Sequence, residues 1–286
     1  MDWNYANDNH STIENEADGV VYLTFPKLEA AGLVHGFSTR MGGVSQGDCA
    51  TMNFGFNRGD SREHVLENFR RFSQALGFHH EDLVLSAQIH KTEIRKVTEK
   101  DKGDGILRET IPGIDGLVTD VPGIPMYTSY ADCVPLIFYD PCKRVAAMAH
   151  SGWRGTVARI GRKMVEYMTT EYGCQPCDII AAIGPSICRS CYEVSEDVAE
   201  AFRQIFTKEE SALILDDKGQ GKYQLDLWKA NELILTQAGI LPEHLDITDL
   251  CTCCNQDKLF SHRASHGRRG NLGCFVYLRP EEGGQV

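Results

Sequence analysis

Residues 131–155, ADCVPLIFYDPCKRVAAMAHSGWRG, constrain the fold of this chain more than any other segment. Two apolar runs, at residues 134–139 and 144–149, flank the tetrapeptide Asp-Pro-Cys-Lys, whose length is typical of a hairpin connection. Pairing the last residue of the first run with the first residue of the second places Cys133 directly opposite His150, on the same face. Opposed Cβ atoms in an antiparallel pair lie roughly 4.5–5.5 Å apart. The pattern therefore predicts a β-hairpin that brings these two side chains together.

A cysteine beside a histidine can provide two ligands of one metal ion, or a thiol and its general base. Core packing is the alternative, since a buried cysteine often acts as a small apolar side chain and a one-residue slip would separate the pair. The flanking residues favour a site. Ser-Gly-Trp-Arg-Gly after His150 predicts a strand-to-helix corner where backbone can approach a ligand. We expect Asp132 and Arg154 to bind substrate there, with Arg154 as a planar donor.

The composition narrows the classes of partner. Of the 286 residues, 42% are hydrophobic, which supports a real core, and the formal net charge of −11 disfavours nucleic acid or an anionic membrane as the main partner. Eleven cysteines, an odd number, cannot all belong to one disulfide framework, which fits a reducing compartment. The acidic N-terminus lacks the pattern of a signal peptide, and no apolar stretch is long enough for a membrane span. We expect a cytoplasmic protein.

Apolar and turn signals alternate evenly after the first residues, without a linker or an internal repeat. We therefore expect a polar N-terminal extension at 1–19 and a single domain over 20–286. The hydrophobic patterns predict strands at 20–25, 33–38, 83–88, 92–97, 115–119, 179–183 and 272–278, and helices at 61–76, 156–172, 196–206 and 227–238. Strands and helices do not alternate strictly and one hairpin is clear, so the fold class is α+β with mixed sheets.

Other segments also carry candidate site residues. Arg40 enters a glycine turn, in STRMGGVS, whose geometry suits an anion. Gln88 and His90 share a face at the end of an apolar strand. If His90 joins the cysteine and histidine of the hairpin, one thiolate and two imidazoles result, a set that binds zinc with one position open and also tolerates copper. The basic segments FSHR (260–263) and GRRG (267–270) suit a phosphate or carboxylate, but solvated surface charge is the preferred interpretation.

Several cysteines have suggestive spacings. Two C-x-x-C pairs are the pattern of a structural zinc site, but the apolar DIIAAIGPSI lies between them in place of polar knuckles, so we expect free thiols. The role of the following residues stays open: Cys174, Cys177, Cys188, Cys191, Cys251, Cys253 and Cys254.

From about residue 33 to its end, the chain resembles the YfiH-like laccase-domain family, whose members are also called polyphenol oxidases, purine nucleoside phosphorylases or peptidoglycan editing factors. The resemblance is carried, in order, by TRMGGVS, NFGFNRGD, QIHKTEI, DGLVTD, ADCVPLIF, AHSGWRGT, IGPSICRSCYEV and FSHR. The C-terminal CTCCNQDKLFSHRASHGRRG departs from the family pattern by its extra cysteines and by His266, which leaves the role of this segment open.

The resemblance implies a layered α/β/β/α fold and a catalytic zinc ion on His90, Cys133 and His150, with copper as the other candidate ion. It also implies that Arg40 lies near the phosphate or ribose end of the cleft. The activity implied is phosphorolysis of adenosine, inosine and methylthioadenosine with phosphate as partner, and deamination of adenosine, for which Asp132 is the candidate acid/base group. The oligomeric state is not predicted, and a homodimer is one candidate.

Other activities remain as alternatives. A cysteine or metal amidohydrolase would edit peptidoglycan precursors, with the thiol of Cys133 and the imidazole of His150 as a metal-free pair in one version. A copper-dependent polyphenol oxidase is a further alternative. Ordinary multicopper oxidases need many histidines in His-x-His pairs, and none of the ten histidines here forms such a pair. A module that only binds a partner would have neither metal nor turnover.

Overall fold

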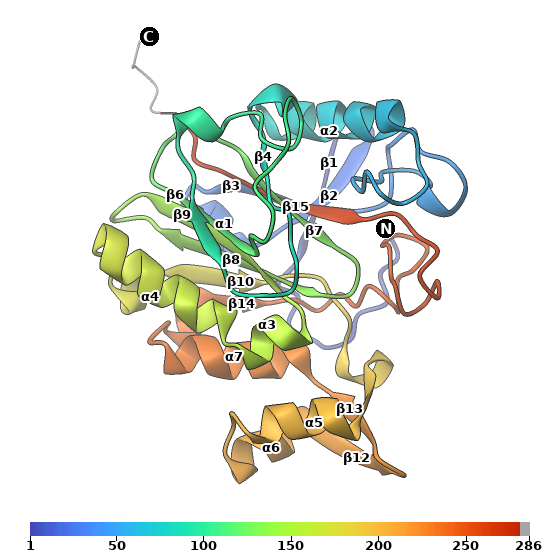
Figure 1. Ribbon diagram of the computed structural model, residues 1–286, viewed down its shortest axis with the longest axis vertical. Helices are drawn as coiled ribbons and strands as arrows, with labels where there is room; N and C mark the ends of the chain where they lie inside the picture. The colour runs from blue at the N-terminus through green and yellow to red at the C-terminus, as the bar shows by residue number, and fades with distance from the viewer. Residues whose placement is uncertain (281–286) are drawn as a thin grey trace.

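Strands from distant parts of the chain lie side by side in three sheets of the computed structural model, which describes residues 1–280 (Figure 1). The first sheet contains, in spatial order, β1 (Ile13–Ala17), β2 (Val20–Thr24), β3 (Val34–Ser38), β15 (Leu272–Tyr277), β7 (Met126–Tyr130) and β4 (Val84–Leu85). The second contains β14 (Leu245–Ile247), β10 (Ile180–Ile183), β8 (Val134–Asp140), β9 (Val145–Ser151), β6 (Gly116–Thr119) and β5 (Ile94–Lys96). A small third sheet contains β11 (Glu193–Ser195), β13 (Lys222–Leu225) and β12 (Leu215–Gly219).

The helices of the described residues are α1 (Pro26–Ala30), α2 (Arg62–Leu76), α3 (Trp153–Val157), α4 (Ile160–Tyr172), α5 (Glu196–Arg203), α6 (Lys208–Ile214) and α7 (Leu227–Gln237). None of them has the length and apolar character that a membrane crossing requires. Parallel pairs, such as β10 with β14, occur among mostly antiparallel ones. The expected α+β class with mixed sheets is therefore confirmed.

The two large sheets pack face to face, because both faces of their central strands are apolar. In β8, Leu136 and Phe138 point toward α4 and α7, whereas Ile137 and Tyr139 join the core between the sheets. On the far side of the first sheet, Phe275 packs against aromatic residues of α2. The resulting order is helix, sheet, sheet, helix, so the expected layers are confirmed.

The helix expected at 61–76 is present as α2, with the Ser61 side chain accepting the first-turn amide of His64 and Gly77 ending the helix at φ 82°. The single helix expected at 156–172 is wrong. Arg159 adopts a left-handed conformation, φ 57°, and this separates α3 from α4.

The hairpin of β8 and β9 forms, but the expected register is wrong by two residues. Pro135, not Cys133, lies opposite His150. β8 extends to Asp140, whose carboxylate accepts hydrogen bonds from two backbone amides of the turn. These hydrogen bonds hold the turn one residue later in the sequence than expected. A shift of two residues keeps side chains on the same face. Cys133 therefore still lies beside His150.

Residues 1–19, expected to be a polar extension, contact the domain at several points. β1 pairs along its length with β2. The backbone amide of Asn4 donates to Oδ1 of Asn255 at 2.8 Å, and Tyr5 forms a bridge with Leu250. This segment therefore contributes an edge strand to the first sheet.

The buried His35 on β3 should make stability depend on pH. The Phe25 amide donates to its Nε2 at 2.8 Å, and its Nδ1 lies 3.0 Å from the Leu33 carbonyl, so the neutral ring with a proton on Nδ1 satisfies both contacts. Burial lowers the pKa of His35 below its usual value. The unfolded chain then takes up a proton that the folded chain does not, so the free energy of unfolding should fall as the pH drops below about 6.5.

Urea unfolding of the wild type and of His35→Gln at pH 7.5 and 5.5 tests this expectation. The variant should lose less stability between the two pH values, whereas the exposed control His79→Gln should behave like the wild type. Equal losses in wild type and His35→Gln would show that His35 is not the group responsible.

Candidate functional site

His90, Cys133 and His150 come together from three parts of the chain. His90 lies in the loop between β4 and β5, Cys133 immediately precedes β8, and His150 lies on β9. One ligand atom from each lies within 4.8 Å of the others, and the two imidazole rings are nearly perpendicular with centroids 4.8 Å apart. His150 is buried, Cys133 is partly buried and His90 is exposed, so the group opens toward solvent on one side.

Gly152 leaves the space that these side chains occupy. A Cβ atom at this position would lie 3.0 Å from the Cys133 sulfur and 3.3 Å from the His90 ring. Any larger residue would push into the group. The first glycine of the Ser-Gly-Trp-Arg-Gly corner is therefore required by close approach, as the sequence indicated.

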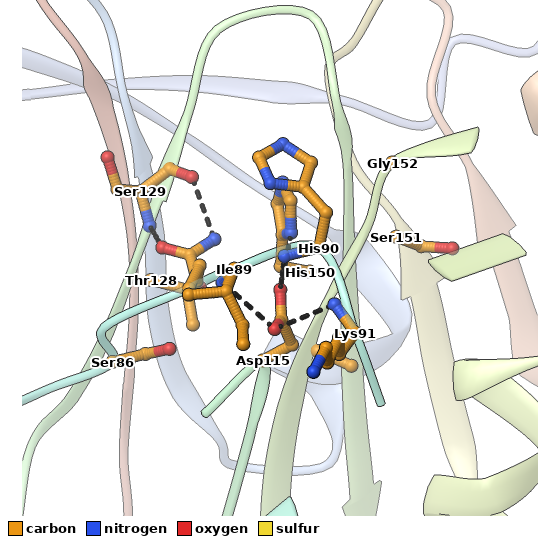
Figure 2. A network of polar contacts seen from close by, with 12 residues as sticks. Ser86, Ile89, His90, Lys91, Asp115, Thr128, Ser129, His150, Ser151 and Gly152 are labelled. Atoms are coloured by element: carbon orange, nitrogen blue, oxygen red, sulfur yellow. Dashed lines mark hydrogen bonds and ion pairs between the residues drawn. The ribbon is translucent and has the colours of Figure 1, made fainter. Parts of the chain in front are cut away.

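Asp115, immediately before β6, fixes both histidines (Figure 2). Its carboxylate lies 3.0 Å from Nδ1 of His150, which leaves Nε2 of that ring free to bind an ion. The same carboxylate accepts three successive backbone amides, those of Ile89, His90 and Lys91, at 3.0–3.1 Å. His90 has a φ of 62°, and these hydrogen bonds hold the loop in that left-handed turn.

The charges of the group are coupled. Burial acts to raise the pKa of the Cys133 thiol, but the charge and hydrogen bond of His150 and the contact with His90 lower it to about 6. Burial acts to lower the pKa of His150, but the Cys133 thiolate and the Asp115 hydrogen bond raise it to about 9. Burial also acts to raise the pKa of Asp115, yet hydrogen bonds from His150 and the loop amides keep it below its usual value. The thiol therefore ionises readily.

The donor set fits a zinc ion. One thiolate and two imidazoles are zinc ligands, and three protein ligands leave a fourth position for substrate or solvent. A carboxylate on the outer nitrogen of a ligating histidine is the usual supporting contact of such sites. Asp115 provides this contact, although the sequence had indicated it only as the first residue of a strand. Its place at the start of the DGLVTD motif was the available signal.

The three residues line a cavity of about 370 Å³. Its wall also includes Gln88, whose side-chain amide is held by two hydrogen bonds to the backbone of Ser129, so Gln88 and His90 face the same space. The remaining lining is partly apolar and partly polar: Phe54, Gly55, Phe56, Asn57, Arg58, Leu85, Ser86, Ala87, Gly105, Thr110, Tyr127, Ser129, Tyr130, Ala131, Arg269 and Asn271.

Two arginines in this wall form no ion pair with a carboxylate anywhere in residues 1–280. Arg58 donates through Nε to Oδ1 of Asn271 at 3.1 Å, and Arg269 donates to the same oxygen. Nε of Arg269 is buried without a hydrogen-bond partner. Burial, and then the positive charge of Arg58, lower the pKa of Arg269 to about 10. Two neighbouring guanidinium groups that form no direct ion pair in this part of the chain are suited to bind an anion.

Arg40, expected from the sequence near the phosphate or ribose end of the cleft, is not among the residues that line the cavity. Its Nε donates to the Ala50 carbonyl at 2.7 Å and its Nη1 to the Gln256 carbonyl at 2.8 Å. The guanidinium also lies over the Phe260 ring, 4.5 Å from its centroid. Because these contacts join two backbone segments, Arg40 is placed to hold the loop rather than a ligand.

Asp132 and Arg154 are also absent from the cavity lining. One oxygen of Asp132 accepts the Thr252 hydroxyl at 2.7 Å and the other accepts the Arg263 amide at 2.6 Å, so both carboxylate oxygens are hydrogen-bonded next to the site. Arg154 is exposed and lies over the Trp153 ring, 4.2 Å from its centroid. The structure thus brings together the three expected metal ligands but not the three expected substrate ligands.

Comparisons with known proteins place the chain among named relatives. Residues 34–279 match the model of the family described as multi-copper polyphenol oxidoreductase laccase. The chain is 39% identical over 270 residues to the purine nucleoside phosphorylase YlmD of Geobacillus stearothermophilus, covering 94% of this chain and 97% of that protein. It is 33% identical to the human purine nucleoside phosphorylase LACC1, covering 80% of this chain and 52% of LACC1.

Solved structures of related proteins are similar to this chain as well. The crystal structure of YlmD from Geobacillus stearothermophilus superposes with a TM-score of 0.88 at 38% identity, covering 93% of this chain and 98% of that one. The Bacillus licheniformis hypothetical protein YfiH has the same TM-score at 32% identity, covering 93% and 99%. The chain therefore belongs to the laccase-like YfiH family.

Proposed function

We propose that this protein is a zinc-dependent purine nucleoside phosphorylase. One observation carries the proposal: a single cavity contains a zinc-type ligand set and two arginines that have no carboxylate partner within residues 1–280. The first feature supplies a Lewis-acid site and the second an anion site. Relatives named purine nucleoside phosphorylases, which match most of this chain, support the same conclusion.

Inorganic phosphate would bind to Arg58 and Arg269. Asn271 lies between the two guanidinium groups and accepts from both, and its amide nitrogen donates to the Ser129 hydroxyl at 2.6 Å. The two side chains are thus held in place before an anion arrives, which lowers the entropic cost of binding.

The purine base would lie against the apolar part of the wall, which Phe56, Leu85 and Tyr127 provide. Aromatic and aliphatic surfaces suit a flat base, and the cavity volume lies in the range of small-molecule sites. His90, Cys133 and His150 would hold the zinc ion. When bound, zinc would supply Lewis acidity toward a substrate oxygen.

In the reaction, an oxygen of hydrogen phosphate forms a bond to C1′ of the ribose as the bond from C1′ to N9 of the base breaks. The bonding electron pair leaves with the base, and the proton of hydrogen phosphate ends on the base, so ribose 1-phosphate and the free purine are the only products. Arg58 and Arg269 orient the phosphate and balance its charge. Attack on C1′ is favoured because the phosphate is already held in position beside the nucleoside.

The proposed substrates are the purine nucleosides adenosine, inosine and methylthioadenosine, in line with the relatives named purine nucleoside phosphorylases. Deamination of adenosine is a second proposed activity, with water in place of phosphate. Asp132 is not assigned the proton transfer in that reaction, because both of its carboxylate oxygens accept hydrogen bonds.

Two alternatives make different predictions. A copper oxidase needs several copper ions, whereas the described residues offer one His-rich group and one group of four cysteines. A cysteine amidohydrolase acting on peptidoglycan precursors would use Cys133 with His150 and would keep its activity after complete metal removal. We also propose a cytoplasmic location, since the cysteines in residues 1–280 form no disulfide.

A nucleoside panel tests the function. Metal-loaded protein is incubated with adenosine, inosine or methylthioadenosine, with and without inorganic phosphate, and the products are separated by chromatography. Base release should require phosphate, and both base release and any deamination should stop in His150→Ala. Base release that is equal without phosphate would instead indicate a hydrolase.

Arg269→Gln should raise the KM for phosphate about 10- to 100-fold, because a hydrogen bond to a charged group contributes about 1.5–3 kcal/mol. The KM for inosine should change much less. Steady-state kinetics with each substrate varied in turn measures both constants. The neighbouring exposed Arg268 is outside the cavity lining, so Arg268→Gln should leave both near wild type. An equal rise of both constants in Arg269→Gln would remove it from the phosphate site.

A further inference from the structure

A second group of metal-ligand type lies outside the cavity. The sulfur atoms of Cys188, Cys191, Cys251 and Cys254 all lie within 4.8 Å of one another, and those of Cys191 and Cys254 are 3.4 Å apart. Cys188 and Cys251 are buried. None of the four takes part in the proposed phosphorolysis.

The fold explains why two C-x-x-C pairs that are 60 residues apart in sequence meet. β10 and β14 are parallel neighbours, so the segments that follow them leave the same edge of the second sheet. Ser186 and Cys251 extend this pairing as a bridge, and the Thr252 amide donates to the Ser186 carbonyl at 3.1 Å. One C-x-x-C pair begins at the bridge, with Cys251, and the other begins two residues beyond it, with Cys188.

The C-x-x-C spacing in the sequence joined Cys188 and Cys191 with Cys174 and Cys177, and we expected free thiols there. The structure groups Cys188 and Cys191 with a different pair. Cys174 is buried, and its pKa is raised by burial and by Asp140, at the other end of the strands. Cys177 is exposed and is not part of the group. The partner pair comes instead from the extra cysteines of the C-terminal motif.

We propose that the four cysteines hold one structural zinc ion. Four thiolates around one zinc ion, with Zn–S bonds of about 2.3 Å, have sulfur atoms roughly 3.8 Å apart in a tetrahedron. The observed separations of 3.4 Å to at most 4.8 Å bracket this value. An iron–sulfur cluster would need wider spacing, because its cysteines bind different iron atoms.

Backbone contacts support thiolates at this site. The amides of Cys188 and Cys254 donate to the sulfur of Cys251, at 3.2 and 3.4 Å. Such donors stabilise negative charge on sulfur and are the supporting contacts expected around a thiolate ligand. A zinc ion would in turn neutralise four crowded thiolates, which would otherwise repel one another.

The proposed ion has a structural role beside the active site. Asp132 precedes Cys133, and its carbonyl accepts the Ile187 amide at 3.0 Å while its carboxylate accepts Thr252 and Arg263. Both segments that would bind the ion therefore hold Asp132. By joining these segments, the ion would fix the backbone from which Cys133 enters the cavity.

Metal analysis of protein purified without added metal tests this proposal without measuring activity. The wild type should contain two zinc ions per chain, and Cys133→Ala should retain one. The double variant Cys191→Ser with Cys254→Ser should also retain one. The control Cys253→Ser, next to the group but outside it, should retain two. Two zinc ions in the double variant, or a single wild-type ion that Cys133→Ala removes, would overturn the proposal.

A measurement on the wild type alone covers the case in which the double variant fails to fold. Native protein is treated with iodoacetamide with and without prior removal of metal by a chelator, and labelled cysteines are located by mass spectrometry. Cys191 and Cys254 should be protected only while metal is present, whereas exposed Cys177 should react in both samples. Labelling of Cys191 and Cys254 that chelation does not change, or iron with acid-labile sulfide in place of zinc, would contradict the assignment.

Discussion

Replacing Cys133 with alanine should empty the site it forms with His90 and His150 and lower kcat/KM for inosine phosphorolysis about a thousandfold or more. The thiolate is the only anionic ligand of the three, so two imidazoles remain as a weak site. Metal content and steady-state kinetics are measured on the same preparation.

Cys142, in the exposed turn of the same hairpin, provides the matched control. Cys142→Ala should retain the metal content and the kinetics of the wild type. If Cys133→Ala kept full metal occupancy, the ligand assignment would be wrong. If it lost the metal but retained phosphorolysis, the metal would have no part in the reaction.

Asp115→Asn should weaken metal binding at the same site about 10- to 100-fold, as loss of a supporting contact to a ligating histidine typically does. An amide cannot replace the carboxylate here, because the His150 nitrogen and three loop amides all donate to it. In Asp115→Asn one side-chain oxygen acceptor would be lost, and the amide nitrogen in its place would face N–H groups that also donate. Competition with a chromogenic zinc chelator gives the affinity.

Asp120 is exposed and follows the opposite end of β6, so Asp120→Asn is the matched control and should bind metal like the wild type. An unchanged affinity in Asp115→Asn would mean that the hydrogen bond to His150 does not orient the ligand. Unfolding in urea, measured on both variants, separates a loss of metal affinity from a general loss of stability.

Much of the site could be predicted because it is local in sequence. The hairpin brings Cys133 and His150 together through a turn of four residues, and an error of two residues in register leaves the face unchanged. Asp115 could not be found in this way. Its carboxylate meets His150 because β6 pairs with β9, and it meets the His90 loop because that loop turns back over the start of β6. Neither contact leaves a spacing pattern in the sequence.

The proposed anion site shows the same limit. Arg40 and Arg58 both lie in glycine-containing turns, and the sequence does not distinguish a guanidinium that binds carbonyl oxygens from one that faces a cavity. In the structure, Arg58 and Arg269 line the cavity, whereas Arg40 lies outside it and donates to two backbone carbonyls. The four-cysteine group likewise depends on the pairing of β10 with β14, which is long-range.

The most direct test of phosphorolysis is ³¹P NMR of metal-loaded protein with inosine and inorganic phosphate. The proposed function predicts that the signal of inorganic phosphate falls and that ribose 1-phosphate appears in equal amount to free hypoxanthine, measured in the same sample by chromatography. Hypoxanthine that forms while the phosphate signal stays constant would contradict it, because the bond to the base would then be broken by water.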